Sequence, residues 1–271
     1  MVAPKSASTV IFLNEGYGSG LRVLMLKRNI ALEFVGGAYV FPGGKVDDGD
    51  KSPKLYSRCV GVDDEEASSR LGVHEDGLSY YIAAIRESFE EAGVFLGSAN
   101  EDKGMLDVTA LYEKRKELNA GQAAFETIIE ELNLELHARR LIYFAHWITP
   151  EGSPRRYDTR FFISALPKDQ VADVDYGETT SSVWISPKEA LERHHQGEFE
   201  MILPTVKSLE VLSQFSSIEE TLKWASRERD IPAITPKLVH LDGGVEILLP
   251  GHPLYDSSAE VFLRDTRDLP T

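Results

Sequence analysis

The chain has 271 residues, of which 42% are hydrophobic and 27% are charged, a composition typical of a soluble globular protein with one large domain or two small ones. Its formal net charge of −15 argues against nucleic acid and anionic membranes as partners, because both are negatively charged. A phosphate-bearing ligand would have to meet a local cationic site or a bound metal ion, and the overall charge favours the metal ion.

A single cysteine, Cys59, excludes an internal disulfide and is too isolated to indicate a zinc site. The first ten residues lack the basic and apolar regions of a signal peptide, and the chain has no run of 18 apolar residues. We therefore expect a cytoplasmic protein that is not held in a membrane. The oligomeric state is open, and a homodimer is one of the states we consider.

The first part of the chain is expected to form strands. Residues 7–13 and 21–27 are apolar or alternate in polarity, and the glycines between them indicate a hairpin loop. A third apolar run, residues 38–41, ends in a predicted turn that contains Gly43 and Gly44.

Residues 45–78 are acidic and show no strong apolar periodicity. They contain one short predicted helix, at residues 64–71. We expect the central part of this segment, residues 51–75, to serve as a flap or lid and not as part of the hydrophobic core.

A longer helix is predicted over residues 79–92 and ends at Gly93. On this helix Glu87, Glu90 and Glu91 lie at i, i+3 and i+4 and share one face. Three carboxylates on one stripe repel one another unless a cation lies among them, and Mg²⁺ prefers oxygen ligands. For these residues alone a solvated acidic face is the simpler interpretation, so the assignment of a metal site needs further sequence evidence.

The rest of the chain mixes helices and strands, which predicts an α+β fold with a mixed sheet between helical layers. We read residues 104–138 as a helical insertion with helices near residues 106–118 and 122–132. Further strands are predicted over residues 141–148, 159–166 and 183–185, further helices from Pro187 and over residues 204–214 and 218–229, and a hairpin over residues 237–241 and 245–249.

The F-P-G-G sequence at residues 41–44 and the R-E-S-F-E-E-A-G-V sequence at residues 86–94 together resemble the two halves of the Nudix box. In that family a loop–helix–loop holds Mg²⁺ or Mn²⁺ against the diphosphate of a nucleoside diphosphate derivative. The resemblance implies a Nudix α/β/α sandwich over residues 1–200, interrupted by the two insertions. Residues 201–271 would be a C-terminal extension packed on the same domain.

The box is split in this chain. The usual spacing places Asp50 where the family has a glutamate, and the expected arginine position holds Arg58, which no acidic run follows. The matching Arg86 lies 28 residues further on, so residues 45–78 are inserted between the two halves. Asp50, Glu75 and Asp76 are the alternatives for the displaced carboxylate.

Other parts of the chain resemble the acyl-coenzyme A diphosphatase branch of the family, which also has a split box. The coenzyme A signature L-L-T-x-R-[SA]-x3-R-x3-G-x3-F-P-G-G keeps its frame over residues 24–44, although Asn29 and Glu33 replace two of its positions. Three later runs also resemble this branch: residues 147–150, 155–162 and 184–187.

The resemblance therefore favours a hydrolase that cleaves the diphosphate linkage of coenzyme A or acyl-coenzyme A. The alternatives are a diphosphatase for ADP-ribose, NADH or a nucleotide sugar, and a non-catalytic Nudix module that binds a nucleotide and regulates a partner.

The same resemblance assigns roles to individual residues. The metal ligands would be Glu87, Glu90 and Glu91. The catalytic residues would be Glu87, Glu90 and Glu178, with Arg86 orienting the carboxylates. The residues for substrate binding would be Arg28, Gly43, Gly44, Arg156 and Arg160, and a surface ion pair is the alternative for each arginine.

Overall fold

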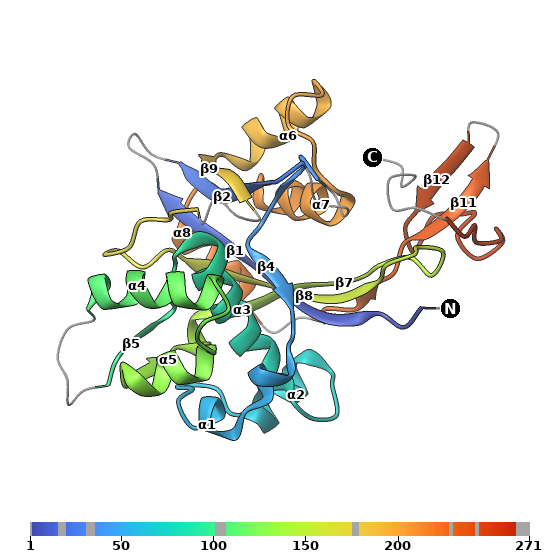
Figure 1. The fold of residues 1–271 in the computed structure, drawn as a ribbon. Helices are drawn as coiled ribbons and strands as arrows, with labels where there is room; N and C mark the ends of the chain where they lie inside the picture. Colours follow the sequence, from blue (N-terminus) through green and yellow to red (C-terminus); the bar gives the residue numbers. More distant parts are fainter. Residues whose placement is uncertain are drawn as a thin grey trace.

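The structure, a computed structural model, describes residues 2–15, 20–30, 36–100, 107–174, 179–227, 230–241 and 244–263. A mixed sheet lies between two helical layers, with α3 on one face and α6 and α7 on the other (Figure 1). This is the predicted α+β class. No helix within the described ranges is long and apolar enough to cross a lipid bilayer.

The described residues form an eight-stranded sheet. Its main path runs β10-β7-β8-β1-β2-β3, while β4 pairs with β1 and β9 pairs with β2. The long β1 lies parallel to β8 and antiparallel to β2 and β4. It therefore joins the part of the sheet that contains β7 and β8 to the part that contains β2 and β3. The strands are β1 Lys5–Glu15, β2 Leu21–Arg28, β3 Tyr39–Val40, β4 Gly43–Lys45, β7 Ile142–Ile148, β8 Tyr157–Ala165, β9 Thr179–Ile185 and β10 Ala233–Ile234.

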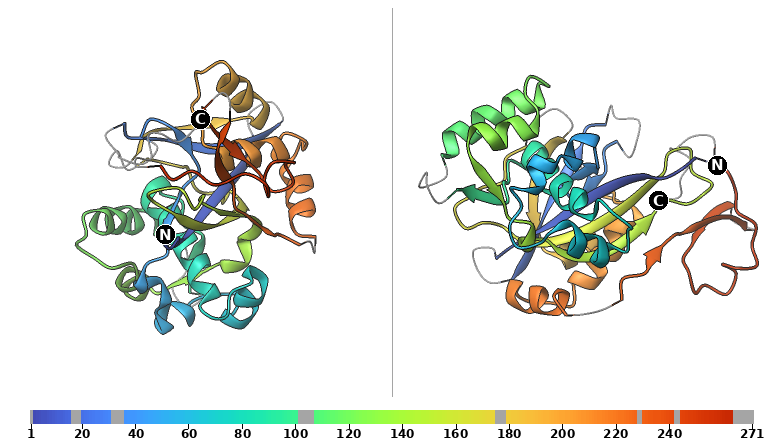
Figure 2. Two further views of the ribbon diagram at one scale, coloured as in Figure 1. Left: turned by 90° about the vertical axis from the view of Figure 1, so that its right-hand side faces the viewer. Right: turned by 90° about the horizontal axis from the view of Figure 1, so that it is seen from below.

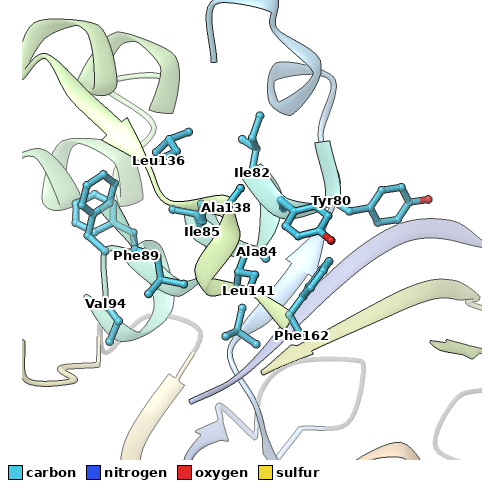
Figure 3. Packing of buried hydrophobic residues seen from close by; sticks show 14 of the residues in the cluster. Tyr80, Ile82, Ala84, Ile85, Phe89, Val94, Leu136, Ala138, Leu141 and Phe162 are labelled. Carbon is cyan, nitrogen blue, oxygen red and sulfur yellow. The ribbon is translucent and has the colours of Figure 1, made fainter. Parts of the chain in front are cut away.

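Helix α3 spans Gly77–Ala92, which confirms the predicted helix and extends its start by two residues. Its apolar residues share a buried core with Phe162 of β8 and with Ala138 and Leu141, which precede β7; Figure 3 shows residues of this core. Gly93 ends the helix in the left-handed conformation at φ 65°, where glycine carries no steric penalty. This burial fixes one side of α3, and the acidic side of the helix faces β4 and the 3-10 helix η1.

The inserted residues 45–78 are part of the core, so the predicted flap or lid is wrong. They form the 3-10 helix η1 Asp48–Lys51, helix α1 Pro53–Tyr56 and helix α2 Asp64–Leu71. Leu55, Val62 and Leu71 are each 5% exposed or less and pack in the same core as α3. Helix α1 buries one apolar residue and α2 buries two, while η1 buries only Asp50, and therefore no extended periodicity marks the segment in the sequence.

Replacing Leu71 by Ala should destabilise the protein by about 2 kcal/mol or more, because it empties a buried position in the core that α2 shares with α3. Ser69→Ala, at an exposed position of the same helix, is the matched control and should change stability by less than about 0.5 kcal/mol. Urea unfolding measures both. Equal small changes would restore the view that the segment is a detachable lid.

The second insertion contains α4 Val108–Asn119 and α5 Phe125–Glu131, close to the predicted helices. Helix α5 contributes Phe125, Ile128 and Ile129 to the buried residues. Helix α4 contacts α3 near its C-terminal end. A separate two-stranded sheet and a 3-10 helix complete this region: β5 Gly97–Ala99, β6 Leu134–Leu136 and η3 Ala138–Arg140.

Much of the second helical layer comes from residues after 200. Helices α7 Leu203–Leu212 and α8 Ile218–Ala225 share a buried cluster with α6 Pro187–His195 on the sheet face opposite α3. The hairpin of β11 Lys237–Leu241 and β12 Gly244–Leu248 lies beyond the end of β7 and β8 (Figures 1 and 2).

Candidate active site

The carboxylates on the acidic face of α3 lie around a buried guanidinium group, that of Arg86 on the same helix. Arg86 is 7% exposed, and its guanidinium binds Asp50 through Nε and Nη2, both at 2.8 Å. Its Nη1 donates to Glu87 at 2.9 Å and to both carboxylate oxygens of Glu90 at 3.3 Å. Because a buried charge needs a partner, the Arg86 guanidinium explains how the carboxylates of Asp50, Glu87 and Glu90 are tolerated here. We call Asp50, Glu87, Glu90 and Glu91 the acidic cluster.

Asp50 is the carboxylate that the structure places against Arg86. It is 2% exposed, and its side chain also accepts a hydrogen bond from the backbone N–H of Asp47 at 2.8 Å, which shapes η1. Of the other two alternatives, Asp76 pairs with Lys51 at 3.1 Å, and Glu75 is exposed. The insertion therefore leaves Asp50 within reach of an arginine 36 positions later.

Gly43 and Gly44 lie in β4, paired with Thr9 and Ser8 of β1, and not in the predicted turn. Glycine is needed at both positions because neighbouring atoms leave no room for a side chain. A Cβ on Gly43 would lie 2.4 Å from the Ser8 carbonyl oxygen, and one on Gly44 would lie 2.3 Å from Oε1 of Glu87. The backbone N–H of Gly43 donates to Glu91 Oε2 at 2.9 Å. The backbone of β4 therefore lies in direct contact with the side chains of Glu87 and Glu91.

Burial disfavours charge on two members of the cluster. It raises the pKa of Glu87 to about 7, although the neighbouring Arg86 opposes the shift. Burial also raises the pKa of Glu90, again against Arg86. One guanidinium therefore does not fully compensate the buried carboxylates, and a further cation would be favourable here.

The raised pKa of Glu87 predicts how stability depends on pH without metal. A carboxyl group with a pKa near 7 in the folded protein and an ordinary value of 4.5 keeps its proton more tightly when folded. The free energy of unfolding should therefore fall as pH rises from about 4.5 to about 7. Glu90 adds to the same trend.

In the Glu87→Gln variant this fall should be shallower, because the titrating group is gone. Urea unfolding in EDTA at several pH values between 5 and 8 measures the slope for both proteins. An identical slope in the variant would show that Glu87 does not titrate in this range.

The donor set suits a hard divalent cation, because carboxylate oxygens are the ligands that Mg²⁺ and Mn²⁺ take in proteins. Within the described ranges, no three or more His, Cys, Asp and Glu side chains are gathered as a ready-made metal site. Glu87 and Glu90 point to Arg86, and Glu91 accepts from Gly43. A bound cation would require these carboxylates to turn from those partners.

Arg28 lies at the end of β2, on the sheet face that carries Leu24 and Leu26 into the core below α3. Within the part of the chain that the structure describes, its Nε is buried without a hydrogen-bond partner. Arg28 pairs in the sheet with Thr179, the residue after Glu178. Glu178 itself, and Glu33 of the signature, lie outside the described residues.

Arg156 and Arg160 are not brought to the acidic cluster. Arg156 is 8% exposed and donates to the carbonyl oxygens of Thr149 and Val2, both at 3.0 Å. Arg160 is 3% exposed, binds Asp158, donates to the Leu71 carbonyl at 3.3 Å and lies over the ring of Tyr80. Among the described residues, both guanidinium groups hold the fold together.

The segment from β4 to η1 also encloses Arg86, a contact that was not predicted from the sequence. The carbonyl of Lys45 accepts from Arg86 Nη2 at 2.8 Å, and the carboxylate of Asp47 lies 3.6 Å from the same nitrogen. An acidic residue at the third position after Asp47 is a helix-start pattern, and it could have indicated the turn at η1.

Comparisons with known proteins give matches in both sequence and structure. Residues 55–212 match the family model described as the NUDT19 Nudix domain. The chain is 28% identical over 283 residues to an acyl-coenzyme A diphosphatase NUDT19 of Xenopus laevis, which covers 90% of this chain and 73% of the relative. A human protein of the same name is 28% identical over 276 residues, covering 87% of this chain and 72% of the relative.

Among solved structures, a NUDIX hydrolase from Alicyclobacillus acidocaldarius has the same fold, with a TM-score of 0.64 and 22% sequence identity. The match covers 82% of this chain and 97% of that one.

Proposed function

Because this chain belongs to the Nudix family, as its match to the NUDT19 Nudix domain shows, we propose that it is a divalent-metal-dependent diphosphatase acting on coenzyme A or acyl-coenzyme A. The relatives named acyl-coenzyme A diphosphatase support the substrate class. The observation that carries the proposal is the acidic cluster, which sets several carboxylates around Arg86 beside the backbone of Gly43 and Gly44.

In this proposal Glu87, Glu90 and Glu91 hold the metal ion, which is Mg²⁺ or Mn²⁺. A divalent ion there would neutralise the oxygens of the diphosphate and make an attacking water more acidic. Arg86 keeps the Glu87 and Glu90 side chains on one side of the helix through its hydrogen bonds. Glu178 is our candidate for the general base or for an additional ligand.

The proposed phosphate-binding cation of the chain is Arg28. A buried guanidinium N–H without a partner costs free energy, and an anionic oxygen would satisfy it. Arg28 is also the arginine that the coenzyme A signature retains. We do not extend this role to Arg156 and Arg160. Arg156 donates to the carbonyl oxygens of Thr149 and Val2, and Arg160, although its Nε also lacks a partner among the described residues, binds Asp158 and donates to the Leu71 carbonyl.

A substrate panel tests the proposal. The purified protein would be given coenzyme A, its form lacking the 3′-phosphate, an acyl-coenzyme A, ADP-ribose, NADH and a nucleotide sugar in Mg²⁺, with products separated by chromatography. We expect coenzyme A or its acyl derivative to have the highest kcat/KM and to give adenosine 3′,5′-bisphosphate and a 4′-phosphopantetheine product. A preference for ADP-ribose or NADH would support the proposed diphosphatase reaction but would contradict coenzyme A or acyl-coenzyme A as the substrate. Cleavage of none would favour the non-catalytic module.

A further inference from the structure

Helix α4, in the second insertion, caps the C-terminal end of α3. Arg115 is 5% exposed and donates to the carbonyl oxygen of Glu90 through Nε at 3.1 Å and Nη2 at 2.9 Å. Asn119, one turn further along α4, donates to the same carbonyl at 3.1 Å. Three N–H donors from another helix therefore converge on the peptide that follows a carboxylate of the acidic cluster.

The same end of α3 is also tied to residues 170–173, which lead toward Glu178. Arg115 Nη2 donates to the carbonyl of Asp173 at 2.8 Å, and the N–H of Asp173 donates to the carbonyl of Ala92 at 2.9 Å. Gln170 binds the N–H and the C=O of Phe95, both at 2.8 Å. Arg115 thus bridges the last turn of α3 and the segment that precedes the proposed base.

Helix chemistry explains why an arginine occupies this place. The last carbonyls of a helix lack partners within the helix, and the negative end of the helix dipole favours a cation. The fit around Arg115 is also close, because a Cβ on Gly93 would lie 2.9 Å from its Nη1. Arg115 therefore fixes where the last turn of α3 lies and does not merely neutralise it.

We propose that Arg115 is a positioning residue for the reaction, with Asn119 in support. By holding the Glu90 peptide, it sets Glu90 and Glu91 at a fixed position relative to the segment that leads to Glu178. The proposal rests on the proposed function, because Glu90 and Glu91 act as metal ligands only there. Loss of groups that orient metal ligands typically weakens metal affinity or activity by about 10–100-fold.

The test measures Mn²⁺ affinity by calorimetry and kcat and KM for coenzyme A, well below the melting temperature. Arg115→Met should weaken Mn²⁺ binding and lower kcat by about 10-fold or more, with KM for coenzyme A within about 3-fold. Arg115→Lys should recover part of both losses. Asn119→Ala removes one donor at a helix end and should weaken Mn²⁺ binding by about 3-fold.

The matched control is Lys116→Met, since Lys116 is an exposed residue of the same helix that pairs with Glu113 and lies over Tyr112. It should leave metal affinity and kcat unchanged. If Arg115→Met does not fold, Asn119→Ala decides alone. Wild-type values in every folded variant would overturn the positioning role while leaving the function standing. A wild-type protein that neither binds Mn²⁺ nor cleaves would overturn both.

Discussion

Replacing Glu90 or Glu91 by Gln should lower kcat for coenzyme A by at least ~10²-fold at saturating Mg²⁺. Each change removes one negative charge from the acidic cluster and keeps the size of the side chain. The loss should appear in kcat, because the removed charge acts on the metal-bound reacting centre and not on remote parts of the substrate. Steady-state kinetics with product chromatography measures it.

Stability separates this effect from misfolding. Gln at position 91 keeps an oxygen that can accept from the Gly43 N–H, so the free energy of unfolding should fall by no more than about 1 kcal/mol. Glu113→Gln, on an exposed face of α4, is the matched control and should retain full activity. Near-normal turnover of both cluster variants would mean that α3 is not the catalytic helix.

Replacing Arg86 by Met should destabilise the metal-free protein by about 3–5 kcal/mol, because it leaves buried carboxylates without their cation. Asp50 would lose both of its 2.8 Å hydrogen bonds to the guanidinium, and Glu87 and Glu90 would lose their shared donor. The loss should be larger at pH 8 than at pH 5, since more of the carboxyl groups can be protonated at the lower pH.

A double variant tests this explanation. Asn at position 50 removes the most buried of the charges, so Arg86→Met combined with Asp50→Asn should be less destabilised than the sum of the two single changes. Urea unfolding of the four proteins in EDTA gives the coupling energy. If the two destabilisations simply add in the double variant, or if Arg86→Met alone destabilises the protein by less than about 1 kcal/mol, the Arg86–Asp50 pair is not the centre of the network.

The sequence predicted the parts of the site that local spacing determines. The acidic face of α3 follows from the i, i+3, i+4 positions of Glu87, Glu90 and Glu91, and the apolar residues of the same helix mark the buried side. The end of the helix at Gly93 follows from the same local rules. Each of these features depends on residues within a few turns of one another.

Features that depend on distant residues were left open or missed. Asp50 was one of three alternatives for the displaced carboxylate, and no local pattern shows that it meets Arg86 or that Leu55 and Leu71 reach the core, because each contact forms only when the insertion folds back on α3. Gly43 and Gly44 suggested a turn, since glycine is common in turns, but here the need is for space beside Ser8 and Glu87.

Metal dependence is tested most directly by following hydrolysis of coenzyme A by the wild-type protein while divalent metal is titrated from EDTA conditions. We expect no turnover without metal, saturable activation by Mg²⁺ or Mn²⁺, and equal amounts of adenosine 3′,5′-bisphosphate and 4′-phosphopantetheine. Turnover that persists in EDTA, or metal binding without any cleavage of a diphosphate substrate, would contradict the proposed function.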